Sequence, residues 1–440
     1  LHPLAAATRD GFLIRLPSSV LGALAAPVTY LAGRLLSERV GLASGALVAL
    51  SFATWSVDAQ ARAYGLVAVL SALALWATLD TSRDGAPRLP WPALAVTATA
   101  LPLLHLVGWL VDVALLAASL IPGTPRRAAR AACFCSGIAA GVGWMGYAAA
   151  GTRSALHGHG LTGSGLGDAP LLFAFLSGLP LPLHWMGIRP VAASEGVTWA
   201  ISVAVATMAA WGLATVARRD RRQAIVLALF TLVPLAGIAS GSMMGLQSYQ
   251  NRYLVPVCSG LFILLGAAAF GEGKSSPASR LARGGMLAMV GVNLATLALY
   301  PADGFLHNQD WVSTASWIEH REQRGDAIVA CIPYSVVGLD FYYRAGQVDI
   351  DFSTPATMQM RFRGDYEGAE QFAIMPSSLD AAMAERLRGR RVFLVFNQAD
   401  PNVQQHVMAW FEAGWQVTDS YQRQGLASWS EIHILELTPR

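Results

Sequence analysis

Two arginines stand at polar corners between long apolar runs. Arg62 lies within residues 59–64 (AQARAY), and Arg252 opens residues 252–256 (RYLVP). A charge beside hydrocarbon is costly unless it faces water, a bundle interior or an anionic partner, so each arginine is a functional hypothesis. A guanidinium can hold a phosphate through two parallel hydrogen bonds. We therefore predict that Arg252 binds a lipid phosphate. The alternative is an arginine that only anchors the membrane edge beside Tyr253.

Other polar side chains are predicted to contact a sugar near these corners. Residues 247–251 (QSYQN) place amides directly before the second arginine, and Gln247 is the first of them. His105 and Asp112 lie seven residues apart, a spacing that puts both on one helix face unless Gly108-Trp109 forms a turn between two spans. His105 is then expected near the outer surface. Asp112 is either a buried base or a structural residue satisfied by a neighbouring helix.

The cysteine and histidine pairs do not predict a metal site. His157-Gly158-His159 stands in a stretch rich in Gly and Ser that offers no third ligand, whereas catalytic zinc needs three protein ligands. We predict a mobile outer loop there. Cys133-Phe134-Cys135 lies within an apolar run and has no second cysteine pair nearby, so these thiols are predicted to be packing residues.

The composition indicates which elements must position these residues. The chain has 440 residues, of which 54% are hydrophobic and 13% charged, whereas soluble domains carry about 25% charged residues. This composition is that of a polytopic α-helical membrane protein. About 20 apolar residues span a bilayer as a helix. We predict ten spans, at Leu13–Leu36, Val40–Val57, Ala63–Leu79, Trp91–Val107, Gly108–Ile121, Ala131–Ala150, Gly196–Ala217, Ala224–Ser240, Tyr253–Phe270 and Gly285–Tyr300.

Two segments of this pattern need a separate interpretation. Residues 15–18 (RLPS) predict the start of the first helix, because proline is tolerated in a first turn. Leu171–Ile188 is apolar but holds Pro180, Pro182 and His184. We interpret it as an interfacial or re-entrant segment and not as a span.

The basic residues predict an orientation for the helices. If the first span runs from outside to inside, the inner loops hold 14 Lys and Arg and the outer loops hold six. An excess of basic residues in short loops marks the cytoplasmic side. We therefore predict that the C-terminal part of the chain, residues 301–440, lies outside the cytoplasm.

A second domain is predicted from residue 301 onward, where the charge balance changes sign. Residues 1–300 hold 20 basic and 10 acidic residues, a net of +10, while residues 301–440 hold 11 and 18, a net of −7. Because no basic stripe is present, nucleic acid is not an expected partner. The second domain is predicted to be soluble and α/β, with Asp310 capping a helix Trp311–Gln323 that ends at Gly325. Strands are expected at Ala327–Ile332, Arg391–Phe396, Trp415–Ser420 and Trp429–Leu437, and helices at Leu379–Leu387 and Val403–Ala413.

The corner at residues 59–64 resembles a motif of the GT-C fold glycosyltransferases, in particular the bacterial relatives of protein O-mannosyltransferases and of the aminoarabinose transferase. In those families a Gln-Glu-Ala-Arg-x-Tyr-like motif stands at the extracytoplasmic end of a membrane helix, and Gln60 takes the place of the acid here. Residues 15–18 (RLPS) and 252–256 (RYLVP) are similar to segments of the same enzymes. The resemblance implies a polytopic enzyme of the bacterial inner membrane.

The same resemblance implies a polyprenyl-phosphate-linked sugar as donor and a protein, lipid or glycan as acceptor. Arg252 and Arg62 would face the donor phosphate. The substrate-binding set is then predicted to comprise Gln60, Arg62, Tyr64, His105, Gln247, Arg252 and Tyr253.

The chemistry implied by the resemblance is an inverting transfer, in which a carboxylate deprotonates the acceptor and the lipid phosphate leaves. In these enzymes the acid comes from the first extracytoplasmic loop, which would lie upstream of Leu1 here. We therefore expect an N-terminally truncated chain that is inactive by itself. The sequence leaves open whether a divalent cation takes part.

Two other functions are compatible with the sequence. A polytopic transporter is expected to show broken helices and paired repeats around a site at the membrane midplane. No clear repeat relates the two halves of the chain, and the charges gather at the outer edge. A polymerase or ligase of lipid-linked polysaccharide would share the same outer arginines.

Overall fold

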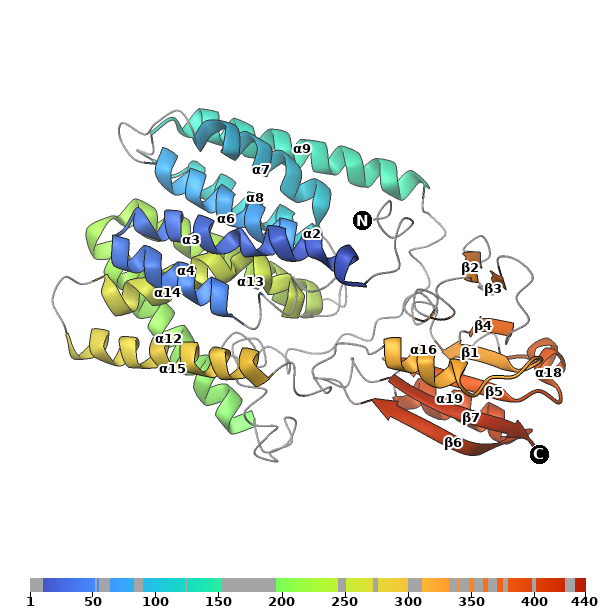
Figure 1. Cartoon of the computed structure of the whole chain (residues 1–440). Coiled ribbons are helices and arrows are strands. Elements are labelled where there is room, and N and C mark those ends of the chain that lie inside the picture. The colour runs from blue at the N-terminus through green and yellow to red at the C-terminus, as the bar shows by residue number, and fades with distance from the viewer. Residues whose placement is uncertain are drawn as a thin grey trace. The chain divides into compact units, whose positions relative to one another are not determined.

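The computed structural model of the chain forms two compact units (Figure 1). The helical unit consists essentially of residues 10–299, and the sheet unit of residues 300–440. The structure describes residues 11–51, 54, 64–82, 90–122, 125–151, 195–243, 251–271, 276–299, 311–331, 339, 343, 348–351, 359–362, 370–374, 379–397, 401–423 and 432–440.

The helical unit is built around two helices that are apolar on all sides. They are α6 (Tyr64–Thr81) and α14 (Val255–Phe270), and nearly every residue of both is buried. A helix without a polar face has to be enclosed by other helices. Those that pack around these two are α2 (Gly11–Ala23), α3 (Ala25–Arg34), α4 (Glu38–Leu50), α7 (Pro90–Leu104), α8 (Leu106–Ser119), α12 (Glu195–Arg219), α13 (Arg221–Met243) and α15 (Pro277–Leu299), while α9 (Arg127–Gly151) packs on α7 and α8.

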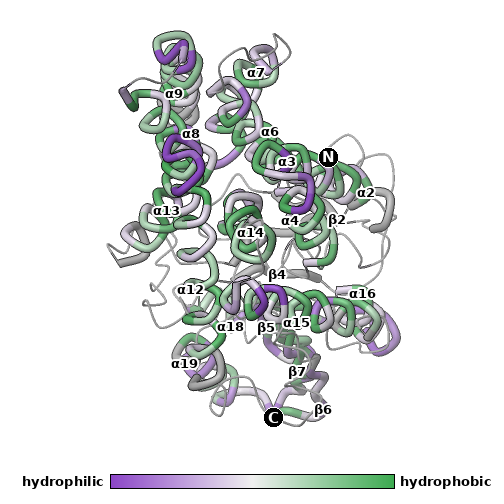
Figure 2. The backbone as a smooth tube through the Cα atoms, turned by 90° about the vertical axis from the view of Figure 1, so that its left-hand side faces the viewer, coloured by the Kyte–Doolittle hydropathy of each residue, from purple (hydrophilic) through white to green (hydrophobic). Residues whose placement is uncertain are grey.

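Hydrophobic residues make up much of the length of the helices in this unit, as the colours of Figure 2 show, and some of their apolar side chains lie on its outside. On α15, for example, Leu281, Leu287 and Leu294 are all exposed. Four segments among the described residues are long and apolar enough to cross a membrane, at Leu16–Arg34, Tyr64–Thr81, Trp199–Arg219 and Arg221–Ser240, and three shorter helices are also apolar. The total of ten spans stays a prediction.

Two local predictions for the helical unit are wrong. Helix α2 already begins at Gly11, so Pro17 lies inside it and not in its first turn. Phe12, Leu13 and Ile14 continue the apolar run upstream of the proline. The polypeptide breaks its helix instead at Leu24, between α2 and α3.

The turn between α7 and α8 lies at His105. The predicted boundary between the spans, at Val107 and Gly108, is therefore wrong, and so is the alternative of a turn at Gly108-Trp109. Gly108 is part of α8 and has a packing role. A Cβ atom at this position would lie 2.2 Å from the carbonyl oxygen of Leu101, so only glycine allows α8 to approach α7 so closely.

The sheet unit contains a seven-stranded sheet with the order β2-β3-β4-β1-β5-β7-β6. Strand β1 is parallel to β4 and β5, and the remaining pairs are antiparallel. The strands are β1 (Ala327–Cys331), β2 (Val348–Asp351), β3 (Gln359–Phe362), β4 (Glu370–Ile374), β5 (Val392–Asn397), β6 (Trp415–Arg423) and β7 (Ile432–Pro439).

Both faces of this sheet are covered, because the side chains of its central strands alternate between two cores. On β1, Ile328 and Ala330 pack with helix α16 (Trp311–Glu319). Ala327, Val329 and Cys331 point to the other face and join the core that contains residues of α18 (Ala381–Leu387) and α19 (Pro401–Glu412). This period of two is what a strand buried on both faces requires.

The predicted elements of this unit lie where the structure has them, but the end of the first helix and the number of strands differ. The three apolar positions of the first helix, Trp311, Ala315 and Ile318, are buried as the spacing predicts. The helix ends at Glu319, however, and not near Gln323. The carboxylate of Asp326 accepts a hydrogen bond from the backbone N–H of Gln323 and so stabilises a turn after the helix. Strands β2, β3 and β4 were not predicted.

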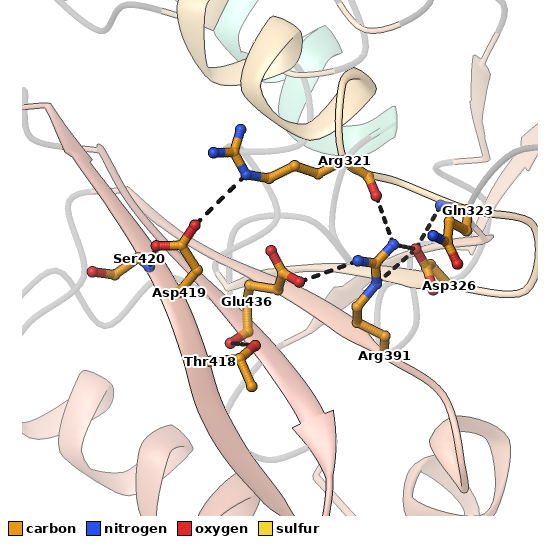
Figure 3. A network of polar contacts seen from close by, with 8 residues as sticks. All are labelled: Arg321, Gln323, Asp326, Arg391, Thr418, Asp419, Ser420 and Glu436. Carbon is orange, nitrogen blue, oxygen red and sulfur yellow. Dashed lines mark hydrogen bonds and ion pairs between the residues drawn. The ribbon is translucent and has the colours of Figure 1, made fainter.

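Arg391, which directly precedes β5, is the centre of a polar network in the sheet unit (Figure 3). Its guanidinium donates to Asp326 through Nε (3.1 Å) and Nη2 (2.5 Å), and to Glu436 through Nη1 (3.1 Å). Nη2 also donates to the carbonyl oxygen of Arg321. The network therefore joins the turn before β1 to β5 and to β7.

Candidate functional site

Three of the predicted substrate-binding residues meet in the helical unit. The ring centroids of Tyr64 and His105 lie 5.1 Å apart, and those of His105 and Tyr253 lie 5.5 Å apart. The histidine stands between the two tyrosines, and its ring is tilted by 59° and 47° to theirs. Tyr64 and Tyr253 are buried, whereas His105 is partly exposed. We call these three residues the aromatic cluster.

The members of the aromatic cluster share one position in their helices. Tyr64 is the first residue of α6, His105 is the N-cap of α8, and Tyr253 lies in the short 3-10 helix Asn251–Leu254 that leads into α14. The three helices also pack against one another. Three helix N-termini therefore converge at the cluster. Such ends carry partial positive charge, which favours an anion.

His105 is held in place by its own backbone and by its ring. Its N–H donates to Leu101, and its carbonyl oxygen accepts from the N–H of Gly108 at 2.9 Å. Its ring Nδ1 accepts from the N–H of Val107 at 3.1 Å, which caps the N-terminus of α8. The indole of Trp109 donates to the carbonyl oxygen of Pro102 and braces the same turn. The imidazole is thus fixed before any ligand arrives.

The remaining predicted residues lie at the edge of what the structure describes. Arg252 belongs to the 3-10 helix next to Tyr253, where its backbone is described and its side chain is not. Gln60, Arg62 and Gln247 lie outside the described residues, as do His157, His159 and Leu171–Ile188. Their predicted roles stay predictions.

Asp112 does not join the aromatic cluster. It lies on α8, two turns beyond His105, and its side chain is fully buried. Neither of its carboxylate oxygens has a hydrogen-bond partner among the residues that the structure describes. The structure therefore provides no support for the alternative that a neighbouring helix satisfies this carboxylate.

A second buried charge escaped the sequence analysis. Arg130, in the first turn of α9, is completely buried and donates from Nη1 to the carbonyl oxygen of Thr78 and to Oγ of Ser82, at the last turn of α6. Its Nε and Nη2 have no partner within the described chain. In the sequence Arg130 follows Arg126 and Arg127 and looks like one more loop arginine, so no local signal distinguishes it.

No group of three or more metal-ligating side chains is found among the described residues. Cys133 and Cys135 are free thiols on α9. Whether a divalent cation takes part in the function therefore stays open.

Comparison with known proteins gives a structural likeness. The chain is similar to the crystal structure of ArnT from Cupriavidus metallidurans bound to undecaprenyl phosphate, with 17% sequence identity and a TM-score of 0.49 over 96% of this chain and 84% of that one. No family model matches the chain, and no curated protein matches it.

Proposed function

We propose that this protein is a membrane glycosyltransferase that moves a sugar from a polyprenyl-phosphate donor to an acceptor on the extracytoplasmic side of the bacterial inner membrane. The observation that carries the proposal is the convergence of the N-termini of α6, α8 and α14 at the aromatic cluster. A phosphate held there would gain from the partial positive charge of three helix ends at once.

The two predicted arginines are close in sequence to members of the aromatic cluster, which limits how far their backbones can lie from it. Arg252 directly precedes Tyr253, and Arg62 precedes Tyr64 by two residues. A residue adds at most about 3.6 Å to an extended chain. The backbone of each arginine therefore stays within about 7 Å of a tyrosine in the aromatic cluster, and an arginine side chain can cover a similar distance. We propose that both guanidiniums bind one phosphate.

The chemistry follows from which group carries the charge. In the transfer, the bond from the sugar to the phosphate breaks and the phosphate takes over the negative charge. Arginines and helix N-termini aimed at that oxygen stabilise the charge as it develops. We propose this role for Arg252 and Arg62. The base that deprotonates the acceptor is not assigned to a residue of this chain.

The first prediction tests the phosphate contact of Arg252. A charged hydrogen bond is worth about 1.5–3 kcal/mol, so Arg252→Ala should weaken the binding of a short-chain polyprenyl phosphate by about tenfold to a hundredfold. Arg252→Lys keeps the charge but loses the planar fork and should fall between Ala and wild type. Binding is measured on the detergent-solubilised protein.

A matched control is Arg222→Ala, which removes an exposed arginine in the first turn of α13. This variant should bind the lipid as the wild type does. If Arg252→Ala binds equally well while folded, Arg252 is only an interface anchor and Arg62 remains as the phosphate ligand. If the wild type binds no polyprenyl phosphate at all, the proposed function is wrong.

A further inference from the structure

We propose that the helical unit binds a short row of water molecules between Asp112 on α8 and Arg130 on α9, past the hydroxyls of Ser71 and Thr78 on α6. We call these four residues the polar row. The inference goes beyond the proposed function and does not depend on it. It follows from the burial of the four side chains, from the atoms that they leave without a partner in the described chain, and from their positions on neighbouring helices.

The polar row holds most of the unsatisfied polar atoms among the described residues. All four side chains are completely buried. Ten buried side-chain nitrogen and oxygen atoms of the described chain have no hydrogen-bond partner. Six of them belong to the polar row, namely Oγ of Ser71, Oγ1 of Thr78, both carboxylate oxygens of Asp112, and Nε and Nη2 of Arg130. Native buried polar groups nearly always have a partner in the protein or in ordered water. Unsatisfied atoms that gather in one region therefore indicate bound water.

Helices α6 and α8 bring the row together because they run side by side in the same direction (Figure 1). Their N-termini meet where the ring of Tyr64 contacts that of His105. At the other end, α9 begins shortly after α8 ends. Arg130, in the first turn of α9, donates to Thr78 and Ser82 at the last turn of α6. The two helices therefore have matching ends.

The spacing along each helix places the polar row on the sides that face each other. Seven residues make nearly two turns, so residues seven apart share a helix face and lie about 10 Å apart along the axis. Ser71 and Thr78 follow Tyr64 at this spacing, and Asp112 follows His105 at the same spacing. Asp112 and the first hydroxyl are then at one level, and the second hydroxyl is one step nearer to the guanidinium. About two or three water molecules bridge such a distance, since an O–H···O bond is about 2.8 Å long.

The two ends of the row favour water over an ion as the ligand. A carboxylate only accepts hydrogen bonds, and a guanidinium only donates them. A cation would be attracted by Asp112 and repelled by Arg130, and an anion would be attracted and repelled in the opposite order. Water both donates and accepts, and so do the hydroxyls of Ser71 and Thr78. One continuous chain of hydrogen bonds can therefore run from the guanidinium to the carboxylate.

Solid-state NMR of the full protein in lipid bilayers detects this water directly. Thr78 and Thr29 are both completely buried, but Oγ1 of Thr29 lies 2.7 Å from the carbonyl oxygen of Ala25 and 2.8 Å from Oγ of Ser259. In protein labelled with carbon-13 threonine, magnetisation that starts on water should reach Thr78 and not Thr29. The variants Thr78→Val and Thr29→Val identify the two signals. If Thr78 receives no more magnetisation than Thr29, the inference is wrong.

Thermal melting in detergent distinguishes bound water from a dry site by the sign of the change. Valine keeps the shape of threonine and removes the hydroxyl. Removing a hydroxyl that has no partner should leave the melting temperature unchanged or raise it, whereas removing one that binds bridging water should lower it. Thr231, on α13 and outside the polar row, is the matched control, because its hydroxyl is also buried and has no partner among the described residues. We expect Thr78→Val to melt below the wild type and Thr231→Val at or above it. A melting temperature of Thr78→Val at or above that of the wild type contradicts the inference.

A double-substitution cycle tests whether the water reaches Arg130. In Arg130→Met the guanidinium is gone, so the hydroxyl of Thr78 no longer belongs to a chain with two charged ends. The drop in melting temperature caused by Thr78→Val should therefore be smaller in the Arg130→Met background than in the wild type. Equal drops would show that the two side chains act independently, which contradicts a shared row of water. None of these measurements involves a polyprenyl phosphate, so the proposed function is tested separately.

Discussion

The two units differ in how their buried ionisable side chains are paired. In the sheet unit the guanidinium of Arg391 is shared between Asp326 and Glu436, and all three side chains are at most about one fifth exposed. In the helical unit Asp112 and Arg130 are fully buried, yet the carboxylate has no partner and the guanidinium uses one of its three nitrogens, as far as the described residues go.

The difference shows what each charge can be for. A buried ion pair with several hydrogen bonds offsets much of its own desolvation, and losing one partner is costly. The Arg391 network therefore belongs to the architecture of the sheet. An unpaired charge among apolar helices offsets nothing, so stability gives no reason for it. Substitutions at Asp326, Arg130 and Asp112 test this comparison, and a fourth prediction concerns the core of the sheet unit.

The largest effect is expected for Asp326→Ala. The substitution removes two hydrogen bonds that Arg391 donates and one that the backbone N–H of Gln323 donates. The mostly buried guanidinium then keeps only one of its two carboxylate partners, Glu436. We expect a loss of about 2–4 kcal/mol in the unfolding free energy of the sheet unit. The loss is measured by unfolding the full protein with urea in detergent. Alkylation of Cys331, which is buried in the folded unit, reports the unfolded fraction at each urea concentration.

The matched control for this substitution is Glu385→Ala. Glu385 pairs with Arg388 at 2.5 Å, but both side chains are mostly exposed. Exposed ion pairs contribute about 0–1 kcal/mol, so this variant should unfold close to the wild type. Equal losses in Asp326→Ala and Glu385→Ala would contradict the structural role of the buried network.

A smaller effect is expected when Arg130 is replaced by methionine. Met keeps most of the volume and removes two nitrogens that have no partner in the described chain, at the loss of the contacts from Nη1 to Thr78 and Ser82. Replacing a poorly paired buried charge by an apolar residue is often close to neutral. The unfolding free energy of the helical unit should therefore change by no more than about 1 kcal/mol. The melting temperature in detergent measures this change.

The same substitution in the sheet unit serves as the comparison. Arg391→Met leaves the carboxylates of Asp326 and Glu436 without their shared cation. It should cost about 2 kcal/mol or more. If Arg130→Met is the more damaging of the two variants, the contrast between the units is wrong.

Asp112→Asn should leave stability unchanged or slightly raised. The amide has nearly the shape of the carboxylate and cannot become charged, so the cost of a charge in apolar surroundings disappears. If Asp112 is retained for function, sugar transfer from a polyprenyl-phosphate donor should fall when this substitution is made in a form of the protein that has transfer activity. Asn293, which donates to the carbonyl oxygen of Met289 on α15, offers a control. Asn293→Ala should lose some stability and no transfer.

The sequence predicts regular structure well where one periodic pattern dominates. The helices α6 and α14 follow from unbroken apolar runs, and strands β1 and β5 from short apolar segments bounded by polar turns. Strand β2 reads Val-Asp-Ile-Asp and has only four residues. Its pairing with β3 (Gln359–Phe362) is a tertiary property, so no local pattern could predict it.

For the candidate site, the residues could be predicted from the sequence but their arrangement in space could not. Tyr64 and Tyr253 are predicted as substrate-binding residues because they belong to the two motifs that resemble those of the GT-C enzymes, and His105 because it is expected near the outer surface. Their meeting could not be predicted, since 41 residues separate the first pair and 148 the second. The cap of α8 is not predicted either, because the boundary between the two spans was expected at Gly108, which is a packing glycine inside α8.

The smallest effect at neutral pH is expected at Cys331, which tests whether the core of the sheet unit is closed. Its thiol is fully buried among apolar residues such as Leu387 and Phe411. Burial raises the pKa of the Cys331 thiol to about 12, from an ordinary value near 9. The thiolate is the reactive form, so iodoacetamide should not label Cys331 at pH 8 until urea unfolds the unit.

The same thiol gives a pH dependence with a defined sign. Between pH 9 and 12 the Cys331 thiol ionises in the unfolded chain but stays protonated in the folded one, because its pKa is raised by burial. The unfolded state then binds fewer protons, so stability falls as the pH rises, by about 1.4 kcal/mol for each pH unit. Below pH 9 the thiol contributes no pH dependence. The stability of Cys331→Ala should therefore fall less steeply than that of the wild type above pH 9, although its smaller side chain lowers stability at every pH. Parallel curves for the two proteins would mean that solvent reaches Cys331 and that the core of the sheet unit is open at this strand.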